Sequence, residues 1–219
     1  PYCGALCSVH HVDVVTHMEE CTLKMLQEYE FDGIVWDEVK TLWNEFRQEE
    51  LVDYHPAAIE KLGEPASGEE QRQASFEVLS RCNRTARDYQ DDLRIVGFVY
   101  ANLADEIVEP WARTDGFDEV GPDGRPGFDE DYPTVAGKTL LSNADRFLSH
   151  AASAGRRSFA LLETQFLDGN EARVAVDRAE QICEAGFDHL SVYYHPMVEE
   201  AEGEVTETLA RILGEWRRG

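Results

Sequence analysis

Phe31-Asp-Gly-Ile-Val-Trp-Asp-Glu38 and Ser158-Phe-Ala-Leu-Leu-Glu163 are two short, mostly apolar runs that each end in a carboxylate. Runs of this length and composition are typical of strands buried in a sheet. A Glu that continues an apolar strand is out of place in a core, because burying an unpaired carboxylate is costly. We therefore expect Glu38 and Glu163 at strand ends, where they are paired, protonated or exposed at the mouth of a site.

Short β-rich runs alternate with longer helical patterns along the whole chain, which indicates a parallel sheet with helical crossovers. This alternation gives six β/α units. The expected strands lie near Tyr2–Val9, Gly33–Asp37, Arg94–Ala101, Gly116–Val120, Ser158–Thr164 and His189–Tyr194. The expected helices lie near Val14–Glu30, Gly68–Asp91, Leu103–Arg113, Lys138–Ala154, Asn170–Ala185 and Glu204–Arg217.

Six units fit either an open doubly wound sheet or the last six units of an eightfold barrel of typically ~250 residues. No Gly-rich phosphate fingerprint follows any strand, which counts against a nucleotide-binding sheet. The chain also begins at Pro1, directly in a strand-like run. The predicted fold is therefore α/β, a (β/α)8 TIM-barrel type lacking its first two β/α units, in one domain over residues 1–219. Two long loops are expected, Val39–Pro65 and Val120–Gly137, and both follow strands, on the face where barrels keep their chemistry.

The charge of the chain restricts its partners and its setting. There are 44 acidic against 20 basic residues, and the formal net charge is −24. Such a polyanion repels nucleic acid and anionic membranes, so neither is an expected partner. The acids are spread along the chain and only four residues are lysines, which favours an acidic surface adapted to a high-salt cytoplasm, of the haloarchaeal kind, over an acidic patch for a basic partner.

The five cysteines predict neither a disulfide framework nor a metal site. Their number is odd and they are widely spaced. The run from Cys3 through Cys7 to His10 and His11 lacks the CxxC spacing and a second ligand cluster, so buried thiols are expected and no metal or cofactor is predicted. No segment approaches the 18 apolar residues of a membrane-spanning helix, and the chain has no signal peptide.

Polar and aromatic side chains follow the predicted strands and supply candidates for substrate binding. Tyr and Trp at such a position stack on sugar faces while their polar tips bind hydroxyl groups. His189 and His150 are expected to be ordinary surface or helix-end residues. The catalytic candidates are Glu38 and Glu163. The substrate-binding candidates are His10, His11, Trp36, Asp37, Tyr100, Asn102, Asp123, Tyr193, Tyr194 and His195.

This pattern resembles the glycoside hydrolase barrels of clan A and their glycosidase-like relatives. In that family an acid/base Glu ends the fourth strand and a nucleophilic Glu ends the seventh. If the run His189–Tyr194 is the eighth strand, Glu163 falls on the seventh and Glu38 on the fourth. The residue before the acid/base is usually Asn in that clan, and here it is Asp37.

Three functions follow from these residues. In a retaining glycoside hydrolase, Glu38 protonates the leaving oxygen and Glu163 attacks the anomeric carbon of a carbohydrate substrate. In a metal-dependent sugar isomerase or lyase, a divalent ion is bound by Glu38, Glu163, Asp118 or Asp123, and one of His10, His11 and His195. In a carbohydrate-binding or structural barrel, the acids only serve the salt-adapted surface. The first is the preferred prediction, and the sequence also allows a homo-oligomer.

Overall fold

The computed structural model describes residues 8–37, 43–44, 49–50, 52–135, 137–164, 167, 169–193, 207–212 and 214–215. The chain divides into two compact units. Unit 1 comprises residues 1–34, 39–95 and 114–116, and unit 2 comprises residues 35–38, 96–113 and 117–219. The single domain expected over residues 1–219 stays a prediction. Among the described residues, no helix is both long and apolar enough to cross a membrane.

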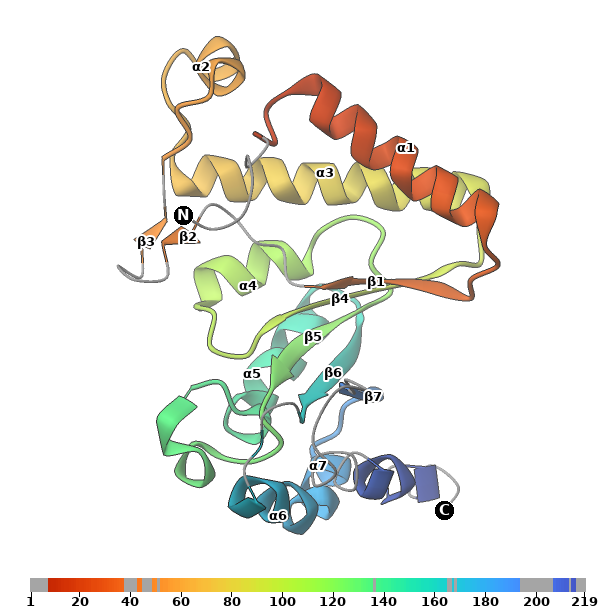
Figure 1. Cartoon of the computed structure of the whole chain (residues 1–219), viewed down its shortest axis with the longest axis vertical. Coiled ribbons are helices and arrows are strands. Elements are labelled where there is room, and N and C mark those ends of the chain that lie inside the picture. The colour runs from red at the N-terminus through yellow and green to blue at the C-terminus, as the bar shows by residue number, and fades with distance from the viewer. Residues whose placement is uncertain are drawn as a thin grey trace. The chain divides into compact units, whose positions relative to one another are not determined.

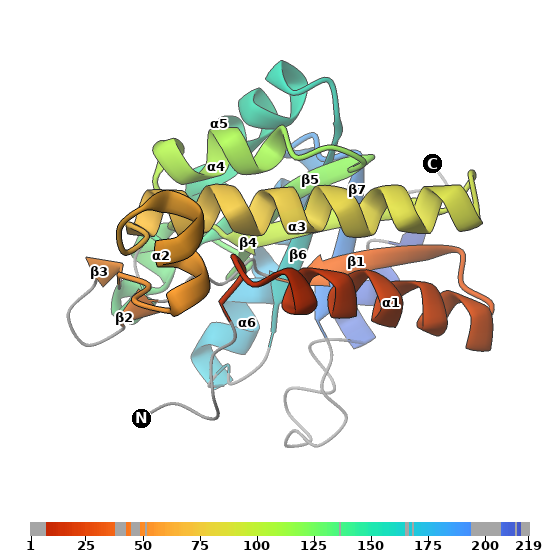
Figure 2. The same ribbon diagram turned by 90° about the horizontal axis from the view of Figure 1, so that it is seen from above.

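Unit 1 is built on two long helices, α1 and α3, that pack side by side (Figures 1 and 2). Helix α3 begins with a capping box in which Ser67 and Glu70 satisfy each other's backbone N–H groups. The guanidinium of Arg81 on α3 binds the carboxylate of Glu19 on α1, with Nε 3.0 Å from Oε1. The other elements of this unit are short. Their bounds are α1 Val12–Glu28, β2 Trp43–Asn44, β3 Glu49–Glu50, α2 Pro56–Leu62 and α3 Gly68–Tyr89.

Unit 2 contains most of a five-stranded parallel sheet that is curled like part of a barrel wall (Figure 1). The strand order is β1-β4-β5-β6-β7, which follows the order of the chain. A doubly wound sheet reverses its order at a switch point, whereas a barrel does not. The described strands therefore have barrel-like order. Their bounds are β1 Gly33–Asp37, β4 Arg94–Tyr100, β5 Glu119–Gly124, β6 Arg157–Glu163 and β7 His189–Tyr193.

Helices cover one face of this sheet. Helix α5 packs against β5 and β6 through buried residues such as Leu140, Phe147 and Ala151. The guanidinium of Arg146 on α5 holds the loop after β4, because it donates to the carbonyl oxygens of Ala101 and Leu103. The bounds are α4 Asp105–Ala112, η1 Asp129–Asp131, η2 Pro133–Val135, α5 Leu140–Ser153, α6 Gly169–Asp177 and α7 Ala179–Glu184.

The structure corrects the predicted position of the third strand in this sheet. The sequence predicts a strand at Gly116–Val120 and a loop from Val120 onward, whereas β5 is Glu119–Gly124 and every residue of it is buried. The Gly-Pro-Asp-Gly run resembles a turn, but it is required for close packing. A Cβ atom on Gly121 would lie 1.6 Å from the carbonyl oxygen of Phe159 on β6, so only glycine fits there.

Three further differences are local. The single helix predicted over Asn170–Ala185 is two helices, α6 and α7, with a break at Arg178. That arginine binds the carboxylate of Asp131 with two hydrogen bonds of 2.9 and 2.8 Å. Residues 8 and 9 form no strand, and the rest of the strand expected over Tyr2–Val9 lies outside the described residues. The loop expected over Val39–Pro65 contains the helix α2. In the helix expected over Glu204–Arg217, the described residues 207–212 and 214–215 are helical, as expected.

Candidate functional site

The strand register places alternate residues of β4, β5, β6 and β7 on one face of the sheet, which we call the site face. Tyr100 is level with Asp123 on the next strand, and Glu163 is level with Tyr193. The middle of the site face is apolar, with Phe98 and Phe159 stacked at 6.1 Å between ring centroids. The site face comprises Val96, Phe98, Tyr100, Glu119, Gly121, Asp123, Arg157, Phe159, Leu161, Glu163, His189, Ser191 and Tyr193.

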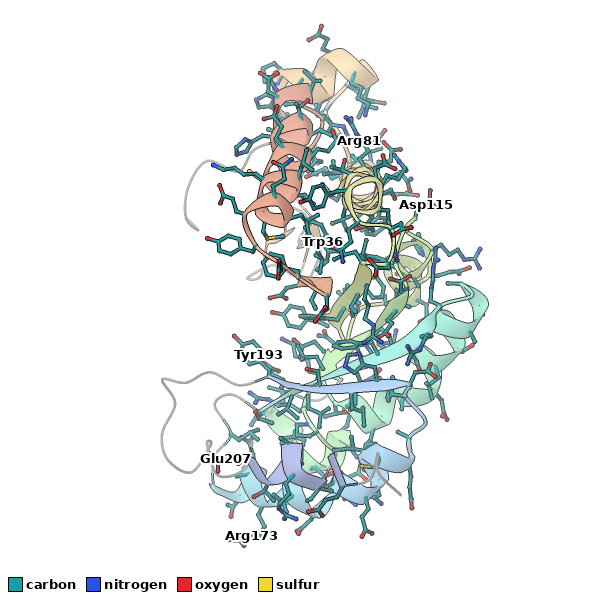
Figure 3. All side chains as sticks on the ribbon, turned by 90° about the vertical axis from the view of Figure 1, so that its right-hand side faces the viewer. Trp36, Arg81, Asp115, Arg173, Tyr193 and Glu207 are labelled. Carbon is teal, nitrogen blue, oxygen red and sulfur yellow. The ribbon has the colours of Figure 1, made fainter. Side chains whose placement is uncertain are left out.

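The carboxyl ends of the strands bring four of the predicted site residues to one edge of the site face. This set, which we call the C-terminal row, consists of Tyr100, Asp123, Glu163 and Tyr193, and Figure 3 marks Tyr193 at the end of β7. Asp123 is buried and level with Leu161, so Glu163 lies two residues further along its strand. Strand spacing then puts the two Cα atoms about 8 Å apart. Two carboxylates and two phenols thus share one edge of the sheet.

Glu163 is held by an arginine that the sequence did not single out. Its carboxylate Oε2 lies 3.8 Å from Nε of Arg125, and the two side chains are only 18% and 12% exposed. The same guanidinium donates from Nη1 to the main-chain oxygen of Glu163 at 3.4 Å. The hydroxyl of Thr164 donates to the main-chain oxygen of Tyr193 at 2.6 Å, which ties the end of β6 to the end of β7. Glu163 is therefore oriented from its carboxylate and from its backbone.

Lys138 joins the same edge from the segment that precedes α5. Its ammonium nitrogen lies 4.8 Å from the ring centroid of Tyr100, a cation–π contact. The exposed Asn102 follows β4 and borders this segment, because a Cβ on Gly137 would lie 3.6 Å from the Cβ of Asn102. The sequence missed Arg125 because it misplaced β5. With the observed bounds of β5, Arg125 is the first residue after a strand, where site residues are expected.

The opposite end of the site face carries a second polar cluster. Glu119 is fully buried, and its Oε2 lies 2.8 Å from Nδ1 of His189. Its Oε1 lies 3.2 Å from Nη1 of Arg157. The ring of His189 also packs edge-to-face on Phe159 at 5.0 Å. The expectation that His189 is an ordinary surface residue is therefore wrong. Burial and pairing of the Glu119 carboxylate are what a stabilising cluster requires, and we assign this cluster that role.

Other predicted site residues lie elsewhere or outside the described residues. Trp36 and Asp37 are on β1, which neighbours β4, and consecutive strand residues point to opposite faces. His10 and His11 belong to unit 1. The backbone N–H of Asp13 donates to Nδ1 of His11 at 3.2 Å, so His11 caps the N-terminus of α1. Substrate binding by Trp36, Asp37, His10 and His11 stays a prediction. Outside the described residues lie Glu38, Tyr194 and His195.

His10 is the titratable group of unit 1 whose setting is unusual. Both ring nitrogens are buried and have no hydrogen-bond partner among the described residues. Burial lowers the pKa of His10, and the nearby charge of Lys61 lowers it further, against the opposing effect of Asp53. Within the described part of the chain, no three His, Cys, Asp or Glu side chains are grouped so that they could hold a metal ion. The lowered pKa favours the neutral form of His10.

Comparisons with known proteins give weak similarities. No protein-family model and no curated protein sequence matches the chain. Among solved structures, the catalytic domain of β-amylase from Paenibacillus polymyxa matches with a TM-score of 0.46 and 10% identity, over 93% of this chain and 54% of that one. The carboxyl transferase domain of Rhizobium etli pyruvate carboxylase, solved with pyruvate and biocytin, matches with a TM-score of 0.42 and 11% identity, over 99% of this chain and 39% of that one. The chain thus spans about half the length of the first structure.

Proposed function

We propose that the chain is part of a (β/α)8 barrel that cleaves glycosidic bonds, with the C-terminal row as its site. The observation that carries this proposal is the row itself: two carboxylates and two phenols on one face, at the carboxyl ends of parallel strands. In barrel enzymes this end of the strands holds the chemistry. The order of the described strands supports the barrel.

In this proposal Glu163 is the nucleophile that attacks the anomeric carbon. Its carboxylate is only partly exposed, and the contacts from Arg125 fix its direction, as an in-line attack requires. Tyr193 is level with Glu163 on the neighbouring strand and offers a ring for the apolar face of a sugar. Tyr100 does the same on the other side of Asp123.

The general acid in this proposal is Glu38, which follows β1 and lies outside the described residues. It protonates the leaving oxygen and then activates the water that releases the sugar. Asp123 lies between Glu163 and Tyr100 on the row, and we assign it hydrogen bonds to sugar hydroxyl groups. A retaining mechanism requires the carboxyl groups of Glu38 and Glu163 to lie about 5–5.5 Å apart.

A panel of aryl glycosides, assayed in concentrated KCl with and without a chelator, tests the function. Glu163→Gln should lower kcat/KM by a factor of about a thousand or more, because it removes the nucleophile. Glu180→Gln is the matched control, since this exposed residue lies on α7, away from the row. Activity that persists in Glu163→Gln would refute the assignment. Activity lost to the chelator and restored by a divalent ion would instead support the isomerase or lyase alternative.

The leaving-group dependence tests Glu38 separately. Glu38→Gln should slow substrates with poor leaving groups more than activated aryl glycosides, because good leaving groups need little proton donation. Equal slowing of both substrate classes would remove Glu38 from the role of general acid. No turnover of any glycoside, together with sugar binding, would favour a carbohydrate-binding barrel.

A further inference from the structure

Two cationic residues, Arg125 and Lys138, have adjacent backbones and both contact the C-terminal row. The backbone N–H of Arg125 donates to the carbonyl oxygen of Lys138 at 2.8 Å, and the N–H of Leu140 donates to the carbonyl of Arg125 at 2.8 Å. Arg125 and Thr139 form an isolated parallel bridge. The backbone therefore fixes the segment after β5, which carries Arg125, against the segment before α5, which carries Lys138.

These cations contact the row on both sides of β5. Lys138 lies over the ring of Tyr100, on β4. Arg125 pairs with Glu163, on β6, and its side chain is 12% exposed. Between them β5 contributes the buried Asp123. The positive charges are thus built into the edge that carries the two carboxylates.

Lys138 is a rare residue type in this chain and differs from Lys24 in its contacts. Only four of the 219 residues are lysines, in a protein of net charge −24. Lys24 pairs with Glu28 on the surface of α1, at 3.7 Å. For Lys138, in contrast, the described residues supply no carboxylate within ion-pair distance, and its ammonium rests on an aromatic ring. A cation–π contact leaves the N–H groups of an ammonium able to donate to a ligand.

We propose that Lys138 binds an acidic group of the substrate, so that the site takes an anionic sugar. That the ligand is a sugar rests on the proposed function. That Lys138 binds an acidic group does not. A carboxylate or phosphate that enters beside Glu163 and Asp123 would be repelled by them. The ammonium of Lys138 offsets that repulsion and supplies charge-assisted hydrogen bonds. The acidic group is a sugar carboxylate or a sugar phosphate.

Calorimetric titration of the 219-residue chain with glucuronate, glucose 6-phosphate and glucose tests the proposal. The measurement is made in about 0.5 M KCl, since higher salt screens the contact further. At least one of the two anionic sugars should bind more tightly than glucose, and the tighter one identifies the acidic group. Lys138→Met should weaken that binding roughly tenfold and leave glucose binding unchanged. Lys138→Arg should keep most of the affinity.

The control is Lys24→Met, which removes an exposed lysine of unit 1 and should change no affinity. Equal binding of glucose and both anionic sugars, or an unchanged affinity in Lys138→Met, would overturn the inference. Failure of the hydrolase proposal gives a different result: the anionic sugar still binds through Lys138, but no glycoside is turned over. Turnover of neutral glycosides without selective binding of anionic sugars would keep the hydrolase and reject this subsite.

Discussion

The buried pair of Glu119 and His189 gives the sharpest stability test of the site face. His189→Leu removes the 2.8 Å hydrogen bond to a carboxylate that is 0% exposed. A hydrogen bond to a charged group contributes about 1.5–3 kcal/mol, so we expect the free energy of unfolding to fall by ~2 kcal/mol. Arg157→Gln should cost less than ~1 kcal/mol, because the Arg157 side chain is 53% exposed and solvent screens its charge.

Urea unfolding of wild type, Glu119→Gln, His189→Leu and the double variant measures the coupling between the two side chains. A coupling energy of about 1.5–3 kcal/mol is expected. Hydrogen exchange should place the loss of protection in β5, β6 and β7. The matched control is His150→Leu, which breaks a 2.9 Å hydrogen bond to the exposed Asp105 and should have a smaller effect. A coupling below ~0.5 kcal/mol would refute the argument that this end of the site face is buried and paired.

Three further predictions concern salt, pH and close packing. The melting temperature should rise between about 0.1 and 2 M KCl, because cations screen a net charge of −24; a flat or falling curve contradicts this. Because burial lowers the pKa of His10 in the folded state, the unfolded state binds a proton more readily below its pKa of about 6.5. Stability is therefore full above that pH and is lost as the pH falls below it. His10→Gln should reduce that loss in urea titrations between about pH 7.5 and 5, and an unchanged slope would contradict the burial of His10. Gly121→Ala should yield little folded protein, since its Cβ would meet the carbonyl of Phe159 at 1.6 Å, whereas Gly214→Ala, with nothing within 4 Å, should fold normally; a Gly121→Ala protein as stable as wild type would contradict the packing.

The sequence predicts the elements whose apolar pattern is regular. The runs at Gly33–Asp37, Arg94–Ala101 and Ser158–Thr164 become strands within a residue of the expected bounds. Alternation along the last of these puts Phe159, Leu161 and Glu163 on one face, in agreement with the strand register. Local patterns therefore suffice where burial alternates with a period of two residues.

The parts that the sequence missed depend on contacts between distant segments. The β5 strand is rich in Gly and Pro because it packs closely against its neighbours, so its composition resembles that of a turn. Once β5 is misplaced, Arg125 cannot be assigned to the strand end. Its pairing with Glu163 and its backbone contact with Lys138 join residues far apart in the chain. No local pattern encodes these contacts.

The most direct test of the central claim, that Glu163 is the nucleophile of a glycosidase, is to trap its covalent intermediate. The chain is incubated with activated 2-deoxy-2-fluoro glycosides, both neutral and anionic, and the adduct is located by peptide mass spectrometry. A retaining mechanism predicts one sugar per chain, bound to the carboxylate of Glu163, and none in Glu163→Gln. A stable adduct on Asp123 or another carboxylate, from a substrate that the enzyme hydrolyses, would contradict the account.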